Sequence, residues 1–363
     1  MKKGRNEKKM ELMKNRRFIR VVVAALLLTM TSWLLPAELM TVKAEAAVQL
    51  DNPVIKDTSQ MEAGQKVTWD CVWFGSYPQS EVVSEVDTDR ISELKNDYYE
   101  NKYVTVSSAD WKKITGASYS NSGDATVDGV KYKRLEKTDA NYATSGSDNY
   151  YNWGDETVHY FRYEPVKWRV LKVDGNDAFL LADKALDDQS YHRENTSVTW
   201  ETCTVRSWLN GYDSSSNSYG RDYTKENFIN TAFSSKERNA IETTDVVNDD
   251  NISYSTEGGN DTSDKIFLLS ENEVYNSNVA FSYGFAKSSG KYDEGRRCQG
   301  TTYARAMGAW SSTDSNYAGN CWWWLRSPGN SSSIAVLVYS YGYVSYSGVL
   351  SAVSTLPFGP LCI

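Results

Sequence analysis

The segment from Val166 to Ala182 constrains the fold most, because it contains two predicted strands and the turn between them. Large apolar residues alternate with other residues from Val166 to Val173, which is the period of a strand. Asp174-Gly175 is a turn dipeptide, and an apolar run at 178–182 follows it. A chain with this segment near its middle needs a sheet in its core.

The other predicted elements are short and of both types. A strand is expected over 67–73, closed by a turn at 75–78, and Asp128-Gly129 is a hairpin signal. Further strands are predicted at 266–269, 334–338 and 349–353, and short helices at 87–102, 200–209, 234–241, 270–273 and 301–307. Capping boxes open two of these helices, at Ser234/Glu237 and Ser270/Glu273. This mixture predicts an α+β fold.

The N-terminal segment predicts export. Basic residues precede an apolar run of roughly 15 residues from Val21, which is shorter than the roughly 20 residues that a membrane-spanning helix needs. Ala44-Glu45-Ala46 has the small-x-small pattern of a cleavage site. We expect a signal peptide at 1–46 and a secreted or surface-associated protein without stable membrane insertion after cleavage; an uncleaved signal anchor is the alternative.

Charge limits the partners of the mature chain. Residues 1–46 hold ten of the 39 basic and four of the 47 acidic residues, so the remaining 317 residues have a net charge of −14. A surface this negative repels phosphate backbones, which argues against nucleic-acid binding. The 12 Trp and 25 Tyr residues suit a core and also suit binding to sugars or proteins.

Residues for catalysis are few. The chain has two histidines, His159 and His192, and neither stands in a metalloprotease motif; no nucleophile-elbow motif is present. We expect His192 to be a packed or loop residue. The acidic loop 248–264 lacks the ligand spacing of an EF-hand, so no cofactor is predicted, and bound calcium has no motif to support it.

Five cysteines, Cys71, Cys203, Cys298, Cys321 and Cys362, leave at least one thiol unpaired. We expect mostly buried free thiols, and Cys298–Cys321 is the first pair to test for a disulfide.

Seven segments carry a resemblance to one family of exported bacterial domains. They are 73–79 (WFGSYPQ), 164–171 (EPVKWRVL), 180–187 (LLADKALD), 199–201 (TWE), 205–210 (VRSWLN), 267–270 (FLLS) and 323–328 (WWLRSP). In this order they resemble the family catalogued as domain of unknown function 6273. The family usually closes with a Gly-Val-Arg-Pro-like segment, whereas residues 356–363 here contain no Arg.

The resemblance implies a fold and a domain plan. The family is similar to C-type-lectin-like domains, which include formylglycine-generating enzymes and the variable proteins of diversity-generating retroelements. This implies one C-type-lectin-like domain over 67–363, with a lead-in at 47–66 and an inserted region at about 84–160. In such proteins a Trp-rich segment leads into terminal strands whose exposed side chains can bind a ligand.

The predicted ligand-binding residues lie in the C-terminal segment. If the strand is regular, Tyr339, Tyr341 and Tyr343 share one face, and Tyr346 lies on the other face or in a turn. Tyr and Ser suit adaptable binding surfaces. The full set is Tyr339, Ser340, Tyr341, Tyr343, Ser345, Tyr346 and Trp323. The alternative for the Tyr residues is a half-buried sheet face. For the Trp run 322–324 we favour burial of two of the three over a role of all three in stacking on sugars.

These observations favour a non-catalytic binding protein that recognises a glycan or a cell-surface protein. A subsidiary hypothesis is that residues 331–354 form a diversified tail. Two alternatives stay open: an oxidase related to formylglycine-generating enzymes, which needs a reactive cysteine pair, and a structural component of a surface assembly. Arg206 and Asn210 are expected to orient a helix, and Arg326 to form structural contacts.

Overall fold

The computed structural model describes residues 50–55, 67–96, 102–143, 148–175, 177–251, 253–275, 277–286, 293–349 and 357–358. The predicted signal peptide and most of the lead-in at 47–66 lie outside these residues. Within the described ranges, no helix combines the length and the apolar character needed to cross a bilayer. The fold is mixed α+β, as predicted.

A six-stranded sheet forms the centre of the molecule. Two long strands dominate it: β3 (Cys71–Ser84) and β7 (Val158–Asp174), which pair antiparallel. The strand order is β4-β3-β7-β6-β5, and β8 (Asp177–Ala182) pairs with the end of β7. The two strands predicted around Asp174-Gly175 are therefore confirmed as a hairpin.

The expected end of the first strand at 75–78 is wrong, because β3 continues to Ser84. Its register against β7 shifts between Trp73 and Ser76 and again between Pro78 and Ser80. Gly75 has a φ of +68°, and a Cβ there would lie 2.6 Å from the Phe233 ring. A bulge at such a glycine bends a strand without ending it, so the residues of a turn produce an irregular strand here.

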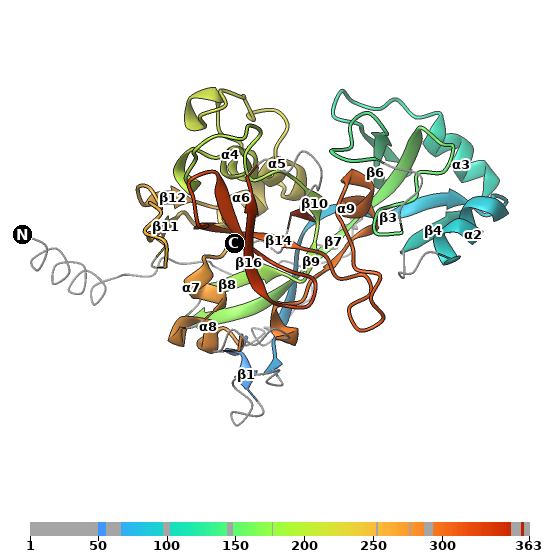
Figure 1. Cartoon of the computed structure of the whole chain (residues 1–363). Coiled ribbons are helices and arrows are strands. Elements are labelled where there is room, and N and C mark those ends of the chain that lie inside the picture. Colours follow the sequence, from blue (N-terminus) through green and yellow to red (C-terminus); the bar gives the residue numbers. More distant parts are fainter. Residues whose placement is uncertain are drawn as a thin grey trace, which may run out of the picture.

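The region at 84–160 forms a smaller lobe on the ends of β3 and β7 (Figure 1). It contains α2 (Thr88–Asn96), β4 (Tyr103–Val106), α3 (Ser108–Thr115), β5 (Asp124–Val127) and β6 (Val130–Glu136). Asp128 and Gly129 both have positive φ and join β5 to β6, which confirms the predicted two-residue hairpin turn. Val82, Ile114 and Tyr132 form a small core of this lobe.

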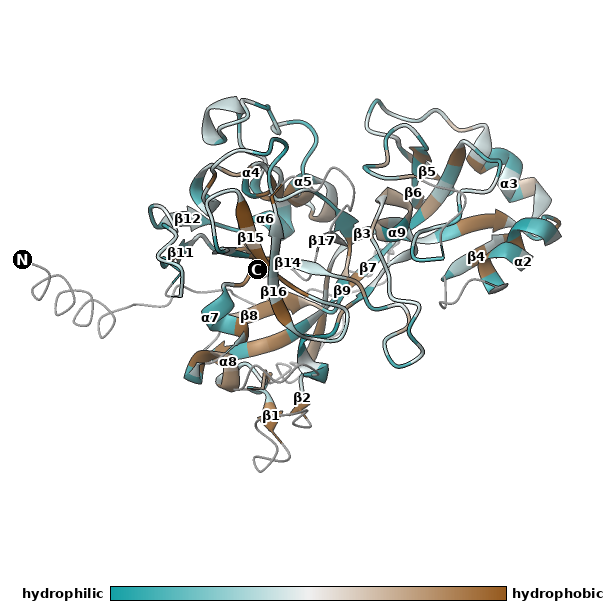
Figure 2. Cartoon of the chain, viewed as in Figure 1, coloured by the Kyte–Doolittle hydropathy of each residue, from teal (hydrophilic) through white to brown (hydrophobic). Residues whose placement is uncertain are grey.

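The larger lobe surrounds a three-stranded antiparallel sheet of β14 (Trp323–Pro328), β15 (Ile334–Val338) and β16 (Val344–Gly348). The strand predicted at 334–338 is confirmed as β15. The next strand begins at Val344 rather than Val349; of the range predicted for it, residues 350–353 lie outside the described residues. The apolar strands β8 and β15 lie inside a polar periphery of loops (Figure 2).

Short paired strands tie distant segments together. They are β1 (Val54–Ile55) with β2 (Val67–Thr68), β9 (Lys184–Ala185) with β13 (Gln299–Gly300), β10 (Asp187–Asp188) with β17 (Pro357–Phe358), and β11 (Thr244–Val246) with β12 (Thr262–Asp264). The pairing of β9 with β13 is parallel and the others are antiparallel. Each is too short to be stable alone.

Short helices pack around the sheets of the larger lobe. They are α4 (Thr204–Asn210), α5 (Phe228–Ala232), α6 (Ser235–Ala240), α7 (Glu271–Val274), α8 (Asn278–Ser282) and α9 (Thr302–Met307), with single 3₁₀ turns η1 (Trp200–Thr202), η2 (Ser214–Ser216) and η3 (Glu294–Arg296). The helix α9 is buried along its whole length. Both predicted capping boxes form, at the N-termini of α6 and α7.

Residues 266–269, predicted as a strand, are buried but have no continuous strand partner. Side chains satisfy three of their main-chain groups instead, and the Leu269 carbonyl accepts from the main-chain N–H of Arg326 at 2.9 Å. The Asn210 amide contacts both N and O of Ile266, and Arg326 donates to the Leu268 carbonyl at 2.7 Å. Arg326 also pairs with Glu273, at 2.5 Å. The structural contacts predicted for Asn210 and Arg326 are thus present.

Candidate functional site

Tyr339, Tyr341 and Tyr343 lie in the loop between β15 and β16, not along a strand as predicted. The loop closes through two main-chain hydrogen bonds of 2.8 Å, from Tyr339 N to Tyr343 O and from Gly342 N to Tyr339 O. The three rings nevertheless gather, with centroids 5.7 to 6.5 Å apart and planes within 29° of one another. A turn, rather than strand alternation, places them together.

The stacked rings belong to a larger half-exposed cluster. Trp322 meets Tyr339 edge-on at 5.0 Å, and Trp310 lies 4.5 Å from Trp322. Tyr317 contacts Tyr341 at 5.9 Å, and the guanidinium of Arg297 lies 5.0 Å from the centre of the Tyr317 ring. We call Trp310, Tyr317, Trp322, Tyr339, Tyr341 and Tyr343 the aromatic surface; all six are partly exposed.

Buried side chains hold the loop of the aromatic surface through its main chain. The Nε of Arg296 donates to the Gly342 carbonyl at 2.8 Å, and the Asn320 amide donates to the Ser340 carbonyl at 3.0 Å. Arg296 is itself fully buried and lies 3.5 Å from the Asp293 carboxylate, which is also fully buried. The position of the three tyrosines is therefore determined by the core beneath them.

Trp323, predicted to bind ligand, is only 1% exposed. Its indole N–H donates to the Arg296 carbonyl at 2.9 Å, so it supports the residue that holds the loop. Trp324 is buried as well and donates to the Gln189 carbonyl at 3.2 Å. Two of the three tryptophans are thus core residues, and the partly exposed one is Trp322.

The other residues predicted to bind ligand differ in their exposure. The Ser340 side chain is buried, whereas Ser345 on β16 is partly exposed. Tyr346 is 38% exposed on β16 and shares a hydrogen bond of 3.1 Å with Tyr254. This hydrogen bond raises the pKa of Tyr254, and the nearby Tyr343 adds a smaller effect in the same direction. The Tyr254–Tyr346 pair therefore lies near one end of the aromatic surface.

Sequence reasoning missed Trp310, Tyr317 and Tyr254 as members of this region. They come from segments that no local periodicity connects to residues 339–343. For Trp322 a signal existed, because adjacent residues of a strand face opposite sides. Choosing between Trp322 and Trp323 needed the position of Arg296, which the sequence does not show.

The geometry around His192 does not activate a serine. His192 is buried, and burial lowers its pKa. The Thr204 N–H donates to its Nδ1 at 3.3 Å, so Nδ1 is an acceptor and Nε2 carries the proton in the neutral ring. Ser218 Oγ lies 3.3 Å from that Nε2. A protonated nitrogen cannot accept the hydroxyl proton, which general-base catalysis requires.

Three thiols of the described residues have pKa values shifted away from reactivity. Burial raises the pKa of Cys71, Cys203 and Cys321, for Cys203 to about 12. A nucleophilic cysteine needs the opposite shift, because the thiolate is the reactive form. In the described part of the chain, no cluster of three or more His, Cys, Asp or Glu side chains has an arrangement that could hold a metal ion.

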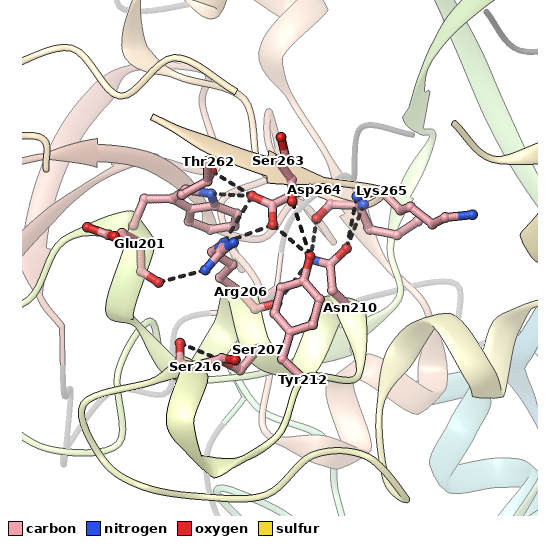
Figure 3. A network of polar contacts seen from close by, with 12 residues as sticks. Glu201, Arg206, Ser207, Asn210, Tyr212, Ser216, Thr262, Ser263, Asp264 and Lys265 are labelled. Carbon is pink, nitrogen blue, oxygen red and sulfur yellow. Dashed lines mark hydrogen bonds and ion pairs between the residues drawn. The ribbon is translucent and has the colours of Figure 1, made fainter. Parts of the chain in front are cut away.

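A buried polar network around Asp264 connects α4 to neighbouring segments (Figure 3). The fully buried Asp264 carboxylate accepts hydrogen bonds from Arg206 at 2.8 Å, Trp200 at 3.1 Å, Thr262 at 2.7 Å and Tyr212 at 3.0 Å. These contacts join η1, α4 and β12. Arg206 thus orients its helix, as expected.

Comparison with protein families matches residues 175–355 to a family described as "Domain of unknown function (DUF6273)". No curated protein matches the chain. No solved structure matches it either. The matched range begins at the turn between β7 and β8 and contains the whole aromatic surface.

Proposed function

We propose, starting from the fact that residues 175–355 form a domain of the DUF6273 family, that this protein is a non-catalytic binding protein whose aromatic surface recognises a glycan. We further propose that it is exported through its N-terminal segment and acts outside the cell or at its surface. On this proposal the fold is C-type-lectin-like over 67–363, with β14 leading into the ligand-binding segment.

One observation carries the proposal: six aromatic side chains form one partly exposed surface above a buried anchor. The apolar C–H faces of sugar rings pack on flat aromatic rings, and the Tyr hydroxyls supply hydrogen bonds at the edges. Anchoring through Arg296 and Asn320 orders the loop before binding, which lowers the entropic cost of binding. The net charge of −14 outside the N-terminal segment favours neutral rather than strongly anionic glycans.

One feature disfavours the oxidase alternative, which needs a reactive cysteine pair: the cysteine thiols with resolved shifts have raised pKa values. The protonated nitrogen that His192 presents to Ser218 disfavours a serine hydrolase instead.

The test is binding of the purified full chain to a panel of glycans, cell-wall fragments and whole cells. The variant Tyr339→Ala/Tyr341→Ala/Tyr343→Ala and the variant Trp322→Ala should each lose about five- to thirtyfold in affinity, because each removes stacking area worth about 1–2 kcal/mol. Tyr219→Ala is the matched control, since Tyr219 is 48% exposed and lies outside the aromatic surface.

Loss of binding in both surface variants, with the control unchanged and all proteins folded, would support the proposal. Binding that survives both variants would move the site elsewhere. If only proteins on whole cells are bound, the ligand class changes from glycan to protein.

A further inference from the structure

Cys298 and Cys321 are neighbours across two paired segments. Gln299 and Asn320 form an antiparallel bridge, so the next pair outward is Cys298 and Cys321. The main-chain N–H of Cys321 donates to the Cys298 carbonyl at 2.8 Å. The Cys321 thiol donates to the same carbonyl at 3.3 Å. Both segments are thus held in register at the two cysteines.

The two cysteines contact each other inside the core through the Cys298 carbonyl, which accepts from both the main-chain N–H and the thiol of Cys321. Both residues are free thiols here and are buried, at 2% and 0% exposure. Opposite residues of antiparallel strands have Cβ atoms about 4.5–5.5 Å apart, and a disulfide needs about 3.5–4.5 Å. A small approach of the two segments therefore meets the requirement.

We propose that Cys298 and Cys321 form an intramolecular disulfide bond in the exported protein, with a protein or small-molecule disulfide as the oxidant. One cysteine thiolate attacks the oxidant's disulfide and forms a mixed disulfide. The second thiolate then displaces the oxidant's remaining sulfur. The S–S bond of the oxidant breaks and that of the protein forms, and the oxidant accepts the two electrons and leaves as a dithiol if it is a protein disulfide or as two thiols if it is oxidised glutathione. The two protons lost by the cysteine thiols are taken up by the two sulfur atoms of the reduced oxidant.

The disulfide forms during folding, before the two thiols are buried. Burial, together with a hydrogen bond between the two thiols, raises the pKa of Cys321 well above its ordinary value. Few thiolates then form at neutral pH, so the folded dithiol reacts slowly. During folding both thiols are exposed to the oxidant, and the finished fold then protects the bond.

The bond has a consequence for the larger lobe. It closes the segment 298–321, which contains α9, Trp310 and Tyr317. Closing a segment of this length restricts the unfolded chain, so the oxidised protein should have a Tm higher by roughly 5 °C. This inference does not depend on ligand binding.

The test is to unfold and reduce the full chain and then refold it with a mixture of oxidised and reduced glutathione. Free thiols are alkylated, and peptides are mapped without reduction. We expect a linked peptide pair containing Cys298 and Cys321 and a mass lower by two hydrogens than that of the reduced protein. The matched control Cys71→Ser, which removes an exposed thiol, should keep this pair. Cys203→Ser should keep it too, because the Cys203 thiol donates to Trp200 O.

Recovery of both Cys298 and Cys321 as alkylated thiols from refolded protein would overturn the proposal, and so would a link from either one to another cysteine. Because the mapping uses the unaltered chain, it does not depend on the folding of a cysteine variant. The variant Cys298→Ser/Cys321→Ser, where it folds, should have the same Tm with and without the oxidant.

Discussion

At the scale of single residues, Arg296 connects the core to the aromatic surface. Its side chain is fully buried beside Asp293 and donates to main-chain carbonyls of Gly342 and Val274. A buried charge in such a position is stable only because its partner and its acceptors are present. The arginine therefore determines both local stability and the position of the loop.

Replacing Arg296 should be strongly destabilising. We expect Arg296→Met to lower the free energy of unfolding by about 3–5 kcal/mol, because Asp293 stays buried without its cation. Urea denaturation followed by Trp fluorescence measures this. In the control Arg134→Met, the lost ion pair with Glu136 is partly exposed, and the expected change is below about 1 kcal/mol. Equal changes in both variants would contradict this role of Arg296.

Asp187 gives the protein a specific pH dependence. Burial raises the pKa of Asp187 to about 6, even though the Tyr77 hydroxyl donates to its carboxylate at 2.5 Å. In the unfolded chain the value is about 3.9. Between these values the folded state binds more protons than the unfolded state, so this group makes stability fall as pH rises.

The variant Asp187→Asn should lack this slope, because an amide does not titrate and its oxygen can still accept from Tyr77. We expect the difference in free energy of unfolding, variant minus wild type, to increase by about 2 kcal/mol from pH 4 to pH 7. Denaturation at a series of pH values tests this, and other carboxylates cancel in the difference. A difference that stays constant with pH would show that Asp187 titrates normally in the folded protein.

At the scale of elements, the loop between β15 and β16 depends on Gly342. Its φ is +88°, and a Cβ at this position would lie 2.2 Å from the Asp293 carbonyl oxygen. The close approach brings the Gly342 carbonyl to Arg296. The loop therefore needs glycine for its conformation and for the space.

The variant Gly342→Ala should cost about 3 kcal/mol of stability, because strain at positive φ adds to a main-chain collision. Gly129→Ala is the matched control: its φ is +81°, but nothing lies within 4 Å of a Cβ there. We expect about 1 kcal/mol for this control. Thermal or urea denaturation of both variants separates the effect of backbone strain from that of the collision. Similar losses of stability in both variants would mean that the loop relaxes and relieves the collision without cost.

Elements with strong local signals could be predicted from the sequence. Asp174-Gly175 and Asp128-Gly129 each gave the correct hairpin, and both Ser-x-x-Glu boxes opened a helix. Prediction failed where distant contacts decide the conformation. Gly75 produces a bulge because β7 continues the pairing, and 266–269 stays out of a sheet because Asn210 and Arg326 satisfy its main chain.

The candidate site could be predicted only in part, for the same reason. Tyr339, Tyr341 and Tyr343 do gather, but through a turn, and Trp323 is a supporting residue. Trp310 and Tyr317 reach the site through the tertiary fold. A pattern of period two describes neighbours on one strand and carries no information about such contacts.

At the scale of the whole molecule, β3 and β7 extend from the larger lobe into the smaller one (Figure 1). The extensive core includes Trp168 and Trp324 in the larger lobe and reaches Leu135 in the smaller one. Val82, Ile114 and Tyr132 form a separate small core in the smaller lobe. Stability is not uniform in such a molecule, because the free energy needed to open a segment locally increases with the apolar area that the segment buries.

We expect Ile114→Ala to act within the smaller lobe. The Ile114 side chain is 1% exposed. Removing it should lower the stability of the smaller lobe, in which its contacts lie, by about 2–5 kcal/mol. Hydrogen exchange should become faster in α3, β5 and β6 and stay unchanged in β14 and β15. Faster exchange throughout the molecule would mean that the two lobes open together.

The hydrogen bonds that hold the loop between β15 and β16 have an evolutionary consequence. They end on the carbonyl oxygens of Ser340 and Gly342, and every amino acid has a carbonyl oxygen. The shape of the loop is thus nearly independent of the side chains at 339, 341 and 343. On the proposed function, exchanging these three residues would change the molecule that is recognised without requiring a new way of folding.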